Sequence, residues 1–401
     1  MLPLVEARGR ILETIAPLGP ESIPVAAAEG RILGEDILAP RALPAFDTSA
    51  VDGYAVRSED VRNASVETPV FLPLTAQIAA GHPAAAFLSP NTCQRIYTGA
   101  MAPPGADAVI MQEDTAPDRT GGALIGITSS AKPLENIRLR GEDIRSGATV
   151  VVRGTRLAFG HIALLSALGI SLVKAGQRPV ATLLASGSEL CEPGQPLGPG
   201  QIYESNRAAL DCLIRKCGGL TRIEPLIGDH LDTLSDAMRD ALEKSDVLVT
   251  IGGVSVGDFD LVRPAFARLG GEILFWKVDV RPGKPFVYGR WRGKLLFGLP
   301  GNPVSAAVCC WLLVRPALLA LQGAAGSESA AIPAILGESL RNRADRPHFF
   351  RVCRGPEGRL YSAGAQGAHI LSSLAGSQGL LEVPPRQTLA AGAEVSFLPW
   401  D

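Results

Sequence analysis

One loop in the second half of the chain has the composition of a phosphate or pterin cradle. It reads GGVSVGDFD over residues 252–260. Gly252, Gly253 and Gly257 let the backbone approach a ligand closely and direct successive N–H groups toward it. Ser255 adds a hydroxyl donor. The loop is neither a G-x-G-x-x-G dinucleotide motif nor a P-loop, and in isolation it also fits an ordinary glycine-rich turn.

Two further loops carry groups that suit the same kind of ligand. One reads PGNPVS, in which Asn302 can cap a helix that begins at Pro303. The free N–H groups and the positive dipole end of that helix would then face a ligand held over Gly301. The other reads SGSEL and brings the carboxylate of Glu189. Any one of these loops could have this composition without binding a ligand. Three of them at one edge of a sheet indicate a binding site much more strongly.

A basic turn and two carboxylates complete the candidate chemistry. The segment KVDVRPGKP presents Arg281 and Lys284 three residues apart on a backbone stiffened by prolines. Such a pair suits a small tetrahedral or phosphoryl oxyanion, although in isolation it also fits a solvated turn. An Asp or Glu beside bound phosphates typically holds Mg²⁺, which makes Glu189 and Asp260 the metal candidates. Asp229 is better placed to cap the next helix.

These loops must be positioned by an alternating pattern of strands and helices between residues 178 and 322. The predicted strands are 179–185, 221–227, 246–251 and 272–278, followed by a hairpin of 286–288 and 294–297. The predicted helices are 206–216, 229–244, 259–269 and a long helix from Pro303. This alternation indicates parallel strands with helices on both faces. Ligands of such sheets bind beyond the carboxyl ends of the strands, where the three loops should meet.

The fold class that we predict is multidomain α/β, with four regions. They are a discontinuous mixed α/β N-terminal domain (1–42 plus 139–174), an inserted β-rich module (43–138), a central open α/β domain of three layers (175–324) and a small C-terminal β-barrel (325–401). Two acidic turns lie in the first half, at Asp52 and at Asp143. Their residue types alone indicate surface turns.

The composition excludes several classes of protein. Hydrophobic residues make up 46% and charged residues 19%, so the chain folds around a sizeable core. A net charge of −2 gives no basic field for nucleic acid or for an anionic membrane. The 44 glycines and 31 prolines, which lack a collagen period, indicate many turns and loops.

The cysteines and the apolar segments indicate a soluble, cytoplasmic protein. Seven cysteines show no zinc spacing and are expected to be reduced thiols. Glu6, Arg8 and Arg10 interrupt the place where a secretory segment needs an apolar run. The most apolar stretch, 306–321, is too short for a membrane span and contains Arg315.

Six motifs, in this order, resemble those of the MoeA family of molybdopterin molybdenumtransferases, and the E domain of gephyrin is similar. The motifs are DTSAVDGYAVR (47–57), TGAMAPPGADAVIMQED (98–114), RGEDIRSG (140–147), GGVSVGDFD (252–260), RPGKP (281–285) and LPGNPVSA (299–306). The tail is matched only by a short GLLEVPP segment. The resemblance therefore spans nearly the whole chain and includes the interruption of the first domain by a β-rich module.

The resemblance implies an activity, a cofactor and an assembly. Family members take adenylylated molybdopterin and molybdate, cleave the pyrophosphate bond with Mg²⁺, release AMP and leave molybdenum on the dithiolene. They are elongated homodimers whose cleft also receives the β-rich module of the partner subunit. A molybdopterin adenylyltransferase, which makes the substrate, is a possible further partner.

The resemblance also assigns roles to residues. The catalytic set is Asp52, Asp143, Glu189 and Asp260, with Glu189 and Asp260 on the metal. The pterin and phosphate set is Gly252, Gly253, Ser255, Pro300, Gly301, Asn302 and Ser305. Gly257 and Lys277 are further candidates for binding the substrate. The molybdate set is Arg281, Lys284, Arg351 and Ser373. Ser188 stands where the family usually has an acid, and Arg281 where lysine is common.

Two other functions remain open at this point. One is a non-catalytic molybdopterin-binding or scaffold protein, against which Asp52, Asp260 and the R-P-G-K turn argue. The other is a molybdopterin adenylyltransferase, whose domain resembles only residues 178–322. Tungstate is also open as an alternative to molybdate, since the two oxyanions have similar size and charge.

Overall fold

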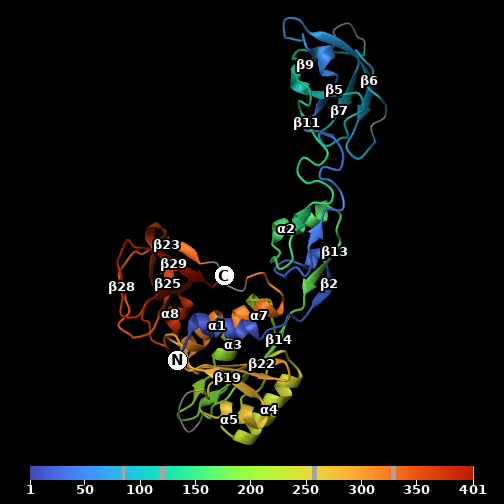
Figure 1. Ribbon diagram of the computed structural model, residues 1–401. Coiled ribbons are helices and arrows are strands. Elements are labelled where there is room, and N and C mark those ends of the chain that lie inside the picture. The colour runs from blue at the N-terminus through green and yellow to red at the C-terminus, as the bar shows by residue number, and fades with distance from the viewer. Residues whose placement is uncertain (84–85, 118–122, 255–259, 327–330, 401) are drawn as a thin grey trace. The chain divides into compact units, whose positions relative to one another are not determined.

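The computed structural model describes residues 1–83, 86–117, 123–254, 260–326 and 331–400 (Figure 1). The chain divides into two compact units. The larger unit contains Met1–Glu35, Arg153–Ala158 and Leu172–Asp401, and the smaller unit contains Asp36–Val152 and Phe159–Ser171. The central α/β domain and the C-terminal module both belong to the larger unit.

The larger unit is built on a six-stranded sheet in the order β17-β14-β18-β22-β21-β19. Its strands are β14 (Val180–Ala185), β17 (Leu220–Ile223), β18 (Val247–Ile251), β19 (Glu272–Trp276), β21 (Val287–Trp291) and β22 (Lys294–Leu299). The first four in the spatial order are parallel, which confirms the predicted α/β pattern. The predicted hairpin is also present, and it makes β21 antiparallel to both β22 and β19.

The sheet is therefore mixed, with parallel strands where strands and helices alternate and antiparallel strands at the predicted hairpin. Arg292 and Gly293 both have positive φ between β21 and β22, the conformation of a tight hairpin turn. A turn this short joins antiparallel strands, because a parallel return needs a crossover. The predicted strand 272–278 is also broken, at Lys277, whose φ of 66° is incompatible with extended backbone.

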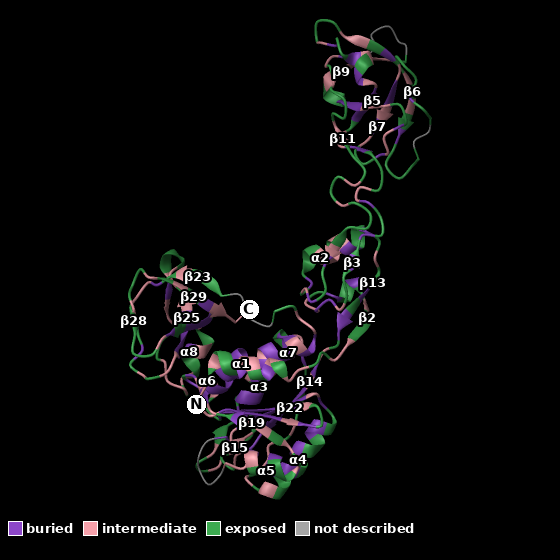
Figure 2. Cartoon of the chain, viewed as in Figure 1, coloured by how far each residue is buried: buried purple, intermediate pink, exposed green. Residues whose placement is uncertain are grey.

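Helices cover both faces of this sheet, as predicted. The helices are α3 (Asn206–Lys216), α4 (Leu231–Glu243), α5 (Val262–Arg268), α6 (Pro303–Cys309) and α7 (Arg315–Leu321), with α1 (Leu4–Glu13) from the N-terminus. Successive side chains of β14 point to opposite faces of the sheet. Leu183 packs in the hydrophobic cluster that contains α1, α3, α6 and α7, and Leu184 packs in the cluster that contains α4 and α5. Figure 2 shows these strands buried between the helices.

The long helix predicted from Pro303 forms, with a π-helical stretch at Cys310–Val314 between α6 and α7. Pro316 explains the irregularity, because proline cannot donate to the carbonyl four residues before it and clashes there. That carbonyl, of Leu312, instead accepts a hydrogen bond of 2.8 Å from Arg8 Nε. By composition the helix could cross a membrane, but 89% of its most apolar window is buried in the protein.

The C-terminal module is an antiparallel sheet in the order β23-β29-β27-β25-β26 with its own core. The strands are β23 (Ile332–Ile335), β25 (His348–Arg354), β26 (Leu360–Ser362), β27 (Gly379–Val383) and β29 (Glu394–Pro399), with helix α8 (Leu371–Ala375) between β26 and β27. A bridge between Leu336 and Leu360 joins the two edges, so the sheet curls as a small barrel does.

The smaller unit contains the predicted β-rich module as a six-stranded sheet in the order β8-β5-β7-β6-β10-β9. Its strands are β5 (Gly53–Val56), β6 (Val70–Ile78), β7 (Cys93–Ile96), β8 (Ala108–Met111), β9 (Thr115–Pro117) and β10 (Leu124–Ile127). The unit also contains helix α2 (Phe159–Ala167). Its short strand pairs are β3 (Ile37–Leu38) with β12 (Thr149–Val151) and β4 (Thr48–Ser49) with β11 (Ile137–Arg138).

Short strand pairs complete the larger unit. They are β1 (Leu2–Pro3) with β20 (Val278–Asp279), β2 (Pro20–Pro24) with β13 (Leu172–Gly176), β15 (Leu190–Cys191) with β16 (Ile202–Tyr203), and β24 (Leu340–Arg341) with β28 (Thr388–Leu389).

Candidate functional site

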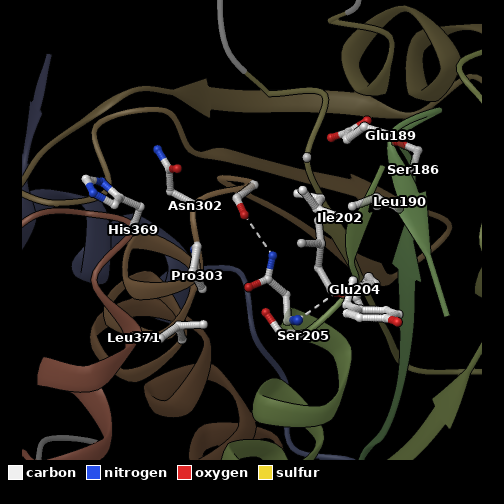
Figure 3. Close-up of a pocket in the computed structure, with 15 residues that line it drawn as sticks. Ser186, Glu189, Leu190, Ile202, Glu204, Ser205, Asn302, Pro303, His369 and Leu371 are labelled. Atoms are coloured by element: carbon white, nitrogen blue, oxygen red, sulfur yellow. Dashed lines mark hydrogen bonds between the residues drawn. The ribbon is translucent and has the colours of Figure 1, made fainter. Parts of the chain in front are cut away.

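A pocket of about 560 Å³ opens at the carboxyl ends of β14, β18 and β22 (Figure 3). All three predicted loops reach it. Ser186 and Glu189 come from the loop after β14, Gly252 from the loop after β18, and Gly301 and Asn302 from the loop after β22. The C-terminal module adds His369 and Leu371, and the segment before α3 adds Ile202, Tyr203, Glu204, Ser205 and Asn206. The expectation that these loops converge at one sheet edge is therefore confirmed.

The loop after β18 needs glycine where it enters the pocket. Gly252 has a φ of +86°, and a Cβ at this position would lie 3.0 Å from the carbonyl oxygen of Ser186. The backbone of one loop thus passes directly against the backbone of another. Gly253, with a φ of +62°, continues the same conformation. Ser255 and Gly257 lie outside the described residues.

The loop after β22 is held by a residue that the sequence analysis missed. Asn206 Nδ2 donates a 2.8 Å hydrogen bond to the carbonyl of Gly301, and its Oδ1 is buried without a partner among the described residues. Asn302 occupies the N-cap position of α6 and Pro303 the first turn, as predicted, but the Asn302 side chain makes no capping bond. Figure 3 shows its amide beside His369, across the pocket from Glu189.

Glu204 is a second missed residue, and it fixes the start of α3. Its carboxylate accepts the backbone N–H groups of Asn206 at 2.6 Å and of Arg207 at 3.0 Å, and it pairs with Arg207 Nε at 2.9 Å. Glu204 thereby orients Asn206 toward Gly301. The sequence signal for this role is weak, because Glu204 lies before both the N-cap position and the first turn, where capping and acidic residues usually mark a helix start.

The structure corrects the role predicted for Asp229. It does not cap α4, whose N-cap residue is His230 without a side-chain cap bond. Asp229 Oδ2 instead accepts both the N–H and the hydroxyl of Ser188 at 3.1 Å, and so braces the loop that carries Glu189. The Asp229 carboxylate therefore accepts hydrogen bonds from the loop and not from the first N–H groups of α4. Ser188 makes this contact through both its backbone and its side chain.

Asp260 combines burial with an absence of partners. Both of its carboxylate oxygens are buried and neither has a hydrogen-bond partner among the described residues. Burial raises its pKa, while the charges of Arg263 and Lys277 oppose that rise. Asp260 is not among the residues that line the pocket, and the described residues contain no group of three or more acidic, His or Cys side chains suited to a metal.

The basic turn is joined to the C-terminal module through backbone hydrogen bonds. Arg281 N donates to the carbonyl of Pro347 at 2.9 Å, and Phe349 N donates to the carbonyl of Arg281 at 2.8 Å. This pairing brings Arg281 alongside β25, which carries Arg351. The pKa of His348 falls to about 4 through burial and the charges of Arg281 and Arg351, so all three side chains share one electrostatic environment.

Arg351 is fully buried and has no carboxylate partner in the described part of the chain. Its Nε donates to Ser373 Oγ and its Nη2 to the carbonyl of Ala365, both at 2.8 Å, while Nη1 is buried without a partner. Burial lowers its pKa to about 10. Lys284 lies on the same turn as Arg281, and its carbonyl accepts the N–H of Val278 at 3.1 Å. Arg351 is thus a buried positive charge without a counterion among the described residues.

The remaining predicted residues lie in two different places. Pro300 and Ser305 are buried at the base of the loop after β22, and Lys277 lies with its Nζ 3.6 Å from the centre of the Trp276 ring. Asp52 and Asp143 belong to the smaller unit. Asp52 Oδ1 accepts the backbone N–H and the hydroxyl of Thr98 at 2.7 and 2.8 Å, which lowers its pKa, and Asp143 is exposed.

Comparisons with known proteins agree with this architecture along the whole chain. Residues 2–169 match the MoeA N-terminal region (domain I and II), residues 182–320 a probable molybdopterin binding domain, and residues 333–400 the MoeA C-terminal region (domain IV). The fold and the pocket thus define a molybdopterin-binding α/β protein with N- and C-terminal modules.

Individual relatives specify the family. The chain is 36% identical over 399 residues to molybdopterin molybdenumtransferase 2 of Mycobacterium tuberculosis, covering 98% of this chain and 97% of that protein. It is 35% identical to the molybdopterin molybdenumtransferase of Haemophilus influenzae, covering 100% and 99%. The solved MoeA structure from Pyrococcus horikoshii OT3 has a TM-score of 0.86 at 30% identity and is covered completely in both chains. The chain belongs to the MoeA family.

Proposed function

We propose that this protein inserts molybdenum into molybdopterin, using adenylylated molybdopterin and molybdate as substrates and releasing AMP. As a MoeA-family protein it is a transferase of molybdenum-cofactor biosynthesis. The observation that carries the proposal is the convergence of three loops into one pocket of about 560 Å³ in a chain that matches the family from end to end. A molybdopterin adenylyltransferase alone would account for the central domain only.

The pocket suits the pterin and phosphate end of the substrate. The glycine-lined loops let backbone N–H groups approach phosphate oxygens, and the Asn302 amide adds side-chain hydrogen-bonding groups. Breaking a phosphoanhydride depends mainly on positioning and on neutralising charge, which these groups can do. The bond between the AMP phosphorus and the bridging oxygen breaks, and AMP leaves with an oxygen taken from water or molybdate.

Asp260 fits the Mg²⁺ that this chemistry requires. Its two oxygens are buried without hydrogen bonds among the described residues, and a hard divalent cation prefers carboxylate oxygens. We propose that Asp260 and Glu189 hold the ion. When bound, Mg²⁺ would neutralise charge on the phosphates of the substrate. The protein's part is to orient the two carboxylates, and Asp229 supports Glu189 through the Ser188 loop.

Arg351 and the basic turn fit the oxyanion. A buried guanidinium without a carboxylate partner is costly unless an anion neutralises it, and its Nη1 still has a hydrogen to donate. Molybdate, or the similar tungstate, would supply that charge together with the acceptors. Arg281 and Lys284 would add further positive charge, and Ser373 would orient Arg351.

We further propose a homodimer in which the smaller unit of the partner subunit brings Asp52 and Asp143 to the cleft. A molybdopterin adenylyltransferase would supply the substrate. We assign the protein to the cytoplasm, because its seven cysteines are free thiols and its most apolar helix is buried.

Incubation of the purified protein with adenylylated molybdopterin and Mg²⁺, with and without molybdate, tests the proposal. AMP release that molybdate stimulates is the expected result. Substrate binding without AMP release under any condition would point to a scaffold protein instead. A monomeric mass at micromolar concentration in light scattering would argue against the shared cleft.

A further inference from the structure

Trp276, at the end of β19, holds two cations on its ring. The guanidinium carbon of Arg263 lies 4.2 Å from the ring centre, and Lys277 Nζ lies 3.6 Å from it. Both distances fall in the range of cation–π contacts. The Trp276 residue is 39% exposed, so the contacts form at the surface of the domain rather than in its core.

The carboxylate of Asp260 interacts electrostatically with the same two cations but pairs with neither. Arg263 is the largest and Lys277 the next of the charges that favour its ionised form. Even so, both Asp260 oxygens and Arg263 Nε are buried without a hydrogen-bond partner in the part of the chain that the structure describes. A buried carboxylate beside an arginine ordinarily forms a hydrogen-bonded ion pair. Here the arginine is on Trp276 instead.

We propose that Trp276 is a positioning residue that holds Arg263 away from Asp260 and so keeps this carboxylate open for a divalent cation. This inference rests on the proposed role of Asp260 in binding Mg²⁺. Cation–π contacts strengthen where the cation is desolvated, so the ring can compete with the carboxylate for one guanidinium. Without the ring, the Arg263 guanidinium would form an ion pair with the Asp260 carboxylate and compete with the metal ion for its oxygens.

Lys277 is restrained on the ring by its backbone. Its N–H donates to the carbonyl of Phe286 at 2.8 Å, and its carbonyl accepts the N–H of Leu2 at 3.3 Å. The left-handed backbone at this residue, with φ 66°, directs its side chain away from the path of a regular strand. Arg263, the second residue of α5, is the charge that acts most strongly on Asp260, and it is therefore the cation that the ring must hold.

The test compares four full-length proteins: wild type, Trp276→Phe, Trp276→Leu and the double variant Trp276→Leu/Arg263→Gln. Mn²⁺ binding is measured by electron paramagnetic resonance without substrate, and crystal structures are determined without metal. Arg292→Gln is the matched control, because Arg292 lies 4.7 Å from the Trp291 ring in the same sheet.

In Trp276→Leu we expect the guanidinium of Arg263 to move within hydrogen-bond distance of Asp260 and Mn²⁺ affinity to fall about fivefold to tenfold. Trp276→Phe keeps an aromatic face and should bind Mn²⁺ as the wild type does. The double variant lacks the competing cation and should recover to within about twofold, and Arg292→Gln should have no effect.

Two results would overturn the inference. One is an Arg263 that stays apart from Asp260 in the Trp276→Leu structure, and the other is a double variant that does not recover Mn²⁺ binding. If the wild type binds no Mn²⁺ but the ion pair still forms in Trp276→Leu, the metal role of Asp260 fails, while the effect of Trp276 on Arg263 stands.

Discussion

Arg351 Nε donates a hydrogen bond of 2.8 Å to the hydroxyl of Ser373, and that hydroxyl in turn donates to the carbonyl of Ile370 at 2.8 Å. The hydroxyl proton of Ser373 is thus used in the hydrogen bond to the Ile370 carbonyl, just before α8. Its oxygen is used to orient the guanidinium. In this arrangement Ser373 serves the proposed oxyanion site by fixing Arg351.

Ser373→Ala should therefore raise the KM for molybdate more than it changes binding of molybdopterin. Arg351 Nε would lose its acceptor while buried, at a cost of about 1–3 kcal/mol, which corresponds to a roughly fivefold higher KM if the oxyanion interaction bears about half of it. The measurement is AMP release as a function of molybdate concentration. Ser372→Ala, on the exposed neighbour, is the control. An unchanged KM would remove Ser373 from the oxyanion site.

Asp260→Asn should reduce Mg²⁺-dependent turnover by about 100-fold or more, since an amide cannot replace an ionised metal ligand. Binding of adenylylated molybdopterin should persist, which equilibrium dialysis can measure. Asp240→Asn replaces an exposed aspartate of α4 and should behave as the wild type. Normal turnover in Asp260→Asn would exclude this carboxylate from the reaction.

The same substitution should stabilise the metal-free protein at neutral pH. Burial raises the pKa of Asp260 above its ordinary value of 3.8, so folding resists ionisation of this group. The penalty is absent below pH 3.8, grows as the pH rises through the folded pKa, and is complete above it. Thermal unfolding should thus show a higher Tm for Asp260→Asn at about pH 7 and equal Tm values at about pH 3. A lower Tm at neutral pH would contradict this account.

Gly252→Ala should damage the pocket. A left-handed backbone costs a residue with a Cβ about 1–2 kcal/mol, and the new Cβ would also press on the Ser186 carbonyl. We expect loss of substrate affinity in addition to lower stability. Gly81→Ala is the matched control, because Gly81 has a φ of +85° and a Cβ added there would have no other atom within 4 Å. Equal activity in both variants would show that the close approach at Gly252 is unimportant.

Asn206→Ala should loosen the loop after β22. The variant loses the hydrogen bond to Gly301, worth about 1 kcal/mol, and we expect kcat/KM to fall about fivefold. Asn63→Ala, on an exposed turn of the smaller unit, serves as the control. If kcat/KM does not change, Asn206 does not position this loop for catalysis.

The sequence was sufficient to predict the three converging loops, because the carboxyl ends of parallel strands necessarily lie at one sheet edge. It could not predict Asn206, whose contact with Gly301 joins residues 95 positions apart. Asp229 shows a different limit. A carboxylate just before a helix can either cap that helix or bind a neighbouring loop, and only the fold brings Ser188 close enough to decide.

The roles of isolated charged residues also could not be predicted from the sequence, because they depend on contacts that only the folded chain makes. Nothing local distinguishes Arg351 from a surface arginine, and its burial follows from the packing of β25 and α8 in the C-terminal module. The donor for the Leu312 carbonyl, which Pro316 leaves without its helical partner, likewise comes from a distant part of the sequence, because Arg8 supplies it. Asp52 and Asp143 were assigned a catalytic role only through the resemblance to the family, because the residue types around each of them indicate an ordinary surface turn.

Transfer of molybdenum is the central claim, and assay of the reaction product tests it most directly. The protein is incubated with adenylylated molybdopterin, Mg²⁺ and molybdate, and the released pterin is then assayed for bound molybdenum and for its ability to activate a cofactor-free molybdenum enzyme. We predict molybdenum bound in equal amount to the AMP released, with activation of the acceptor. AMP release that yields a molybdenum-free pterin, unable to activate the acceptor, would contradict the account.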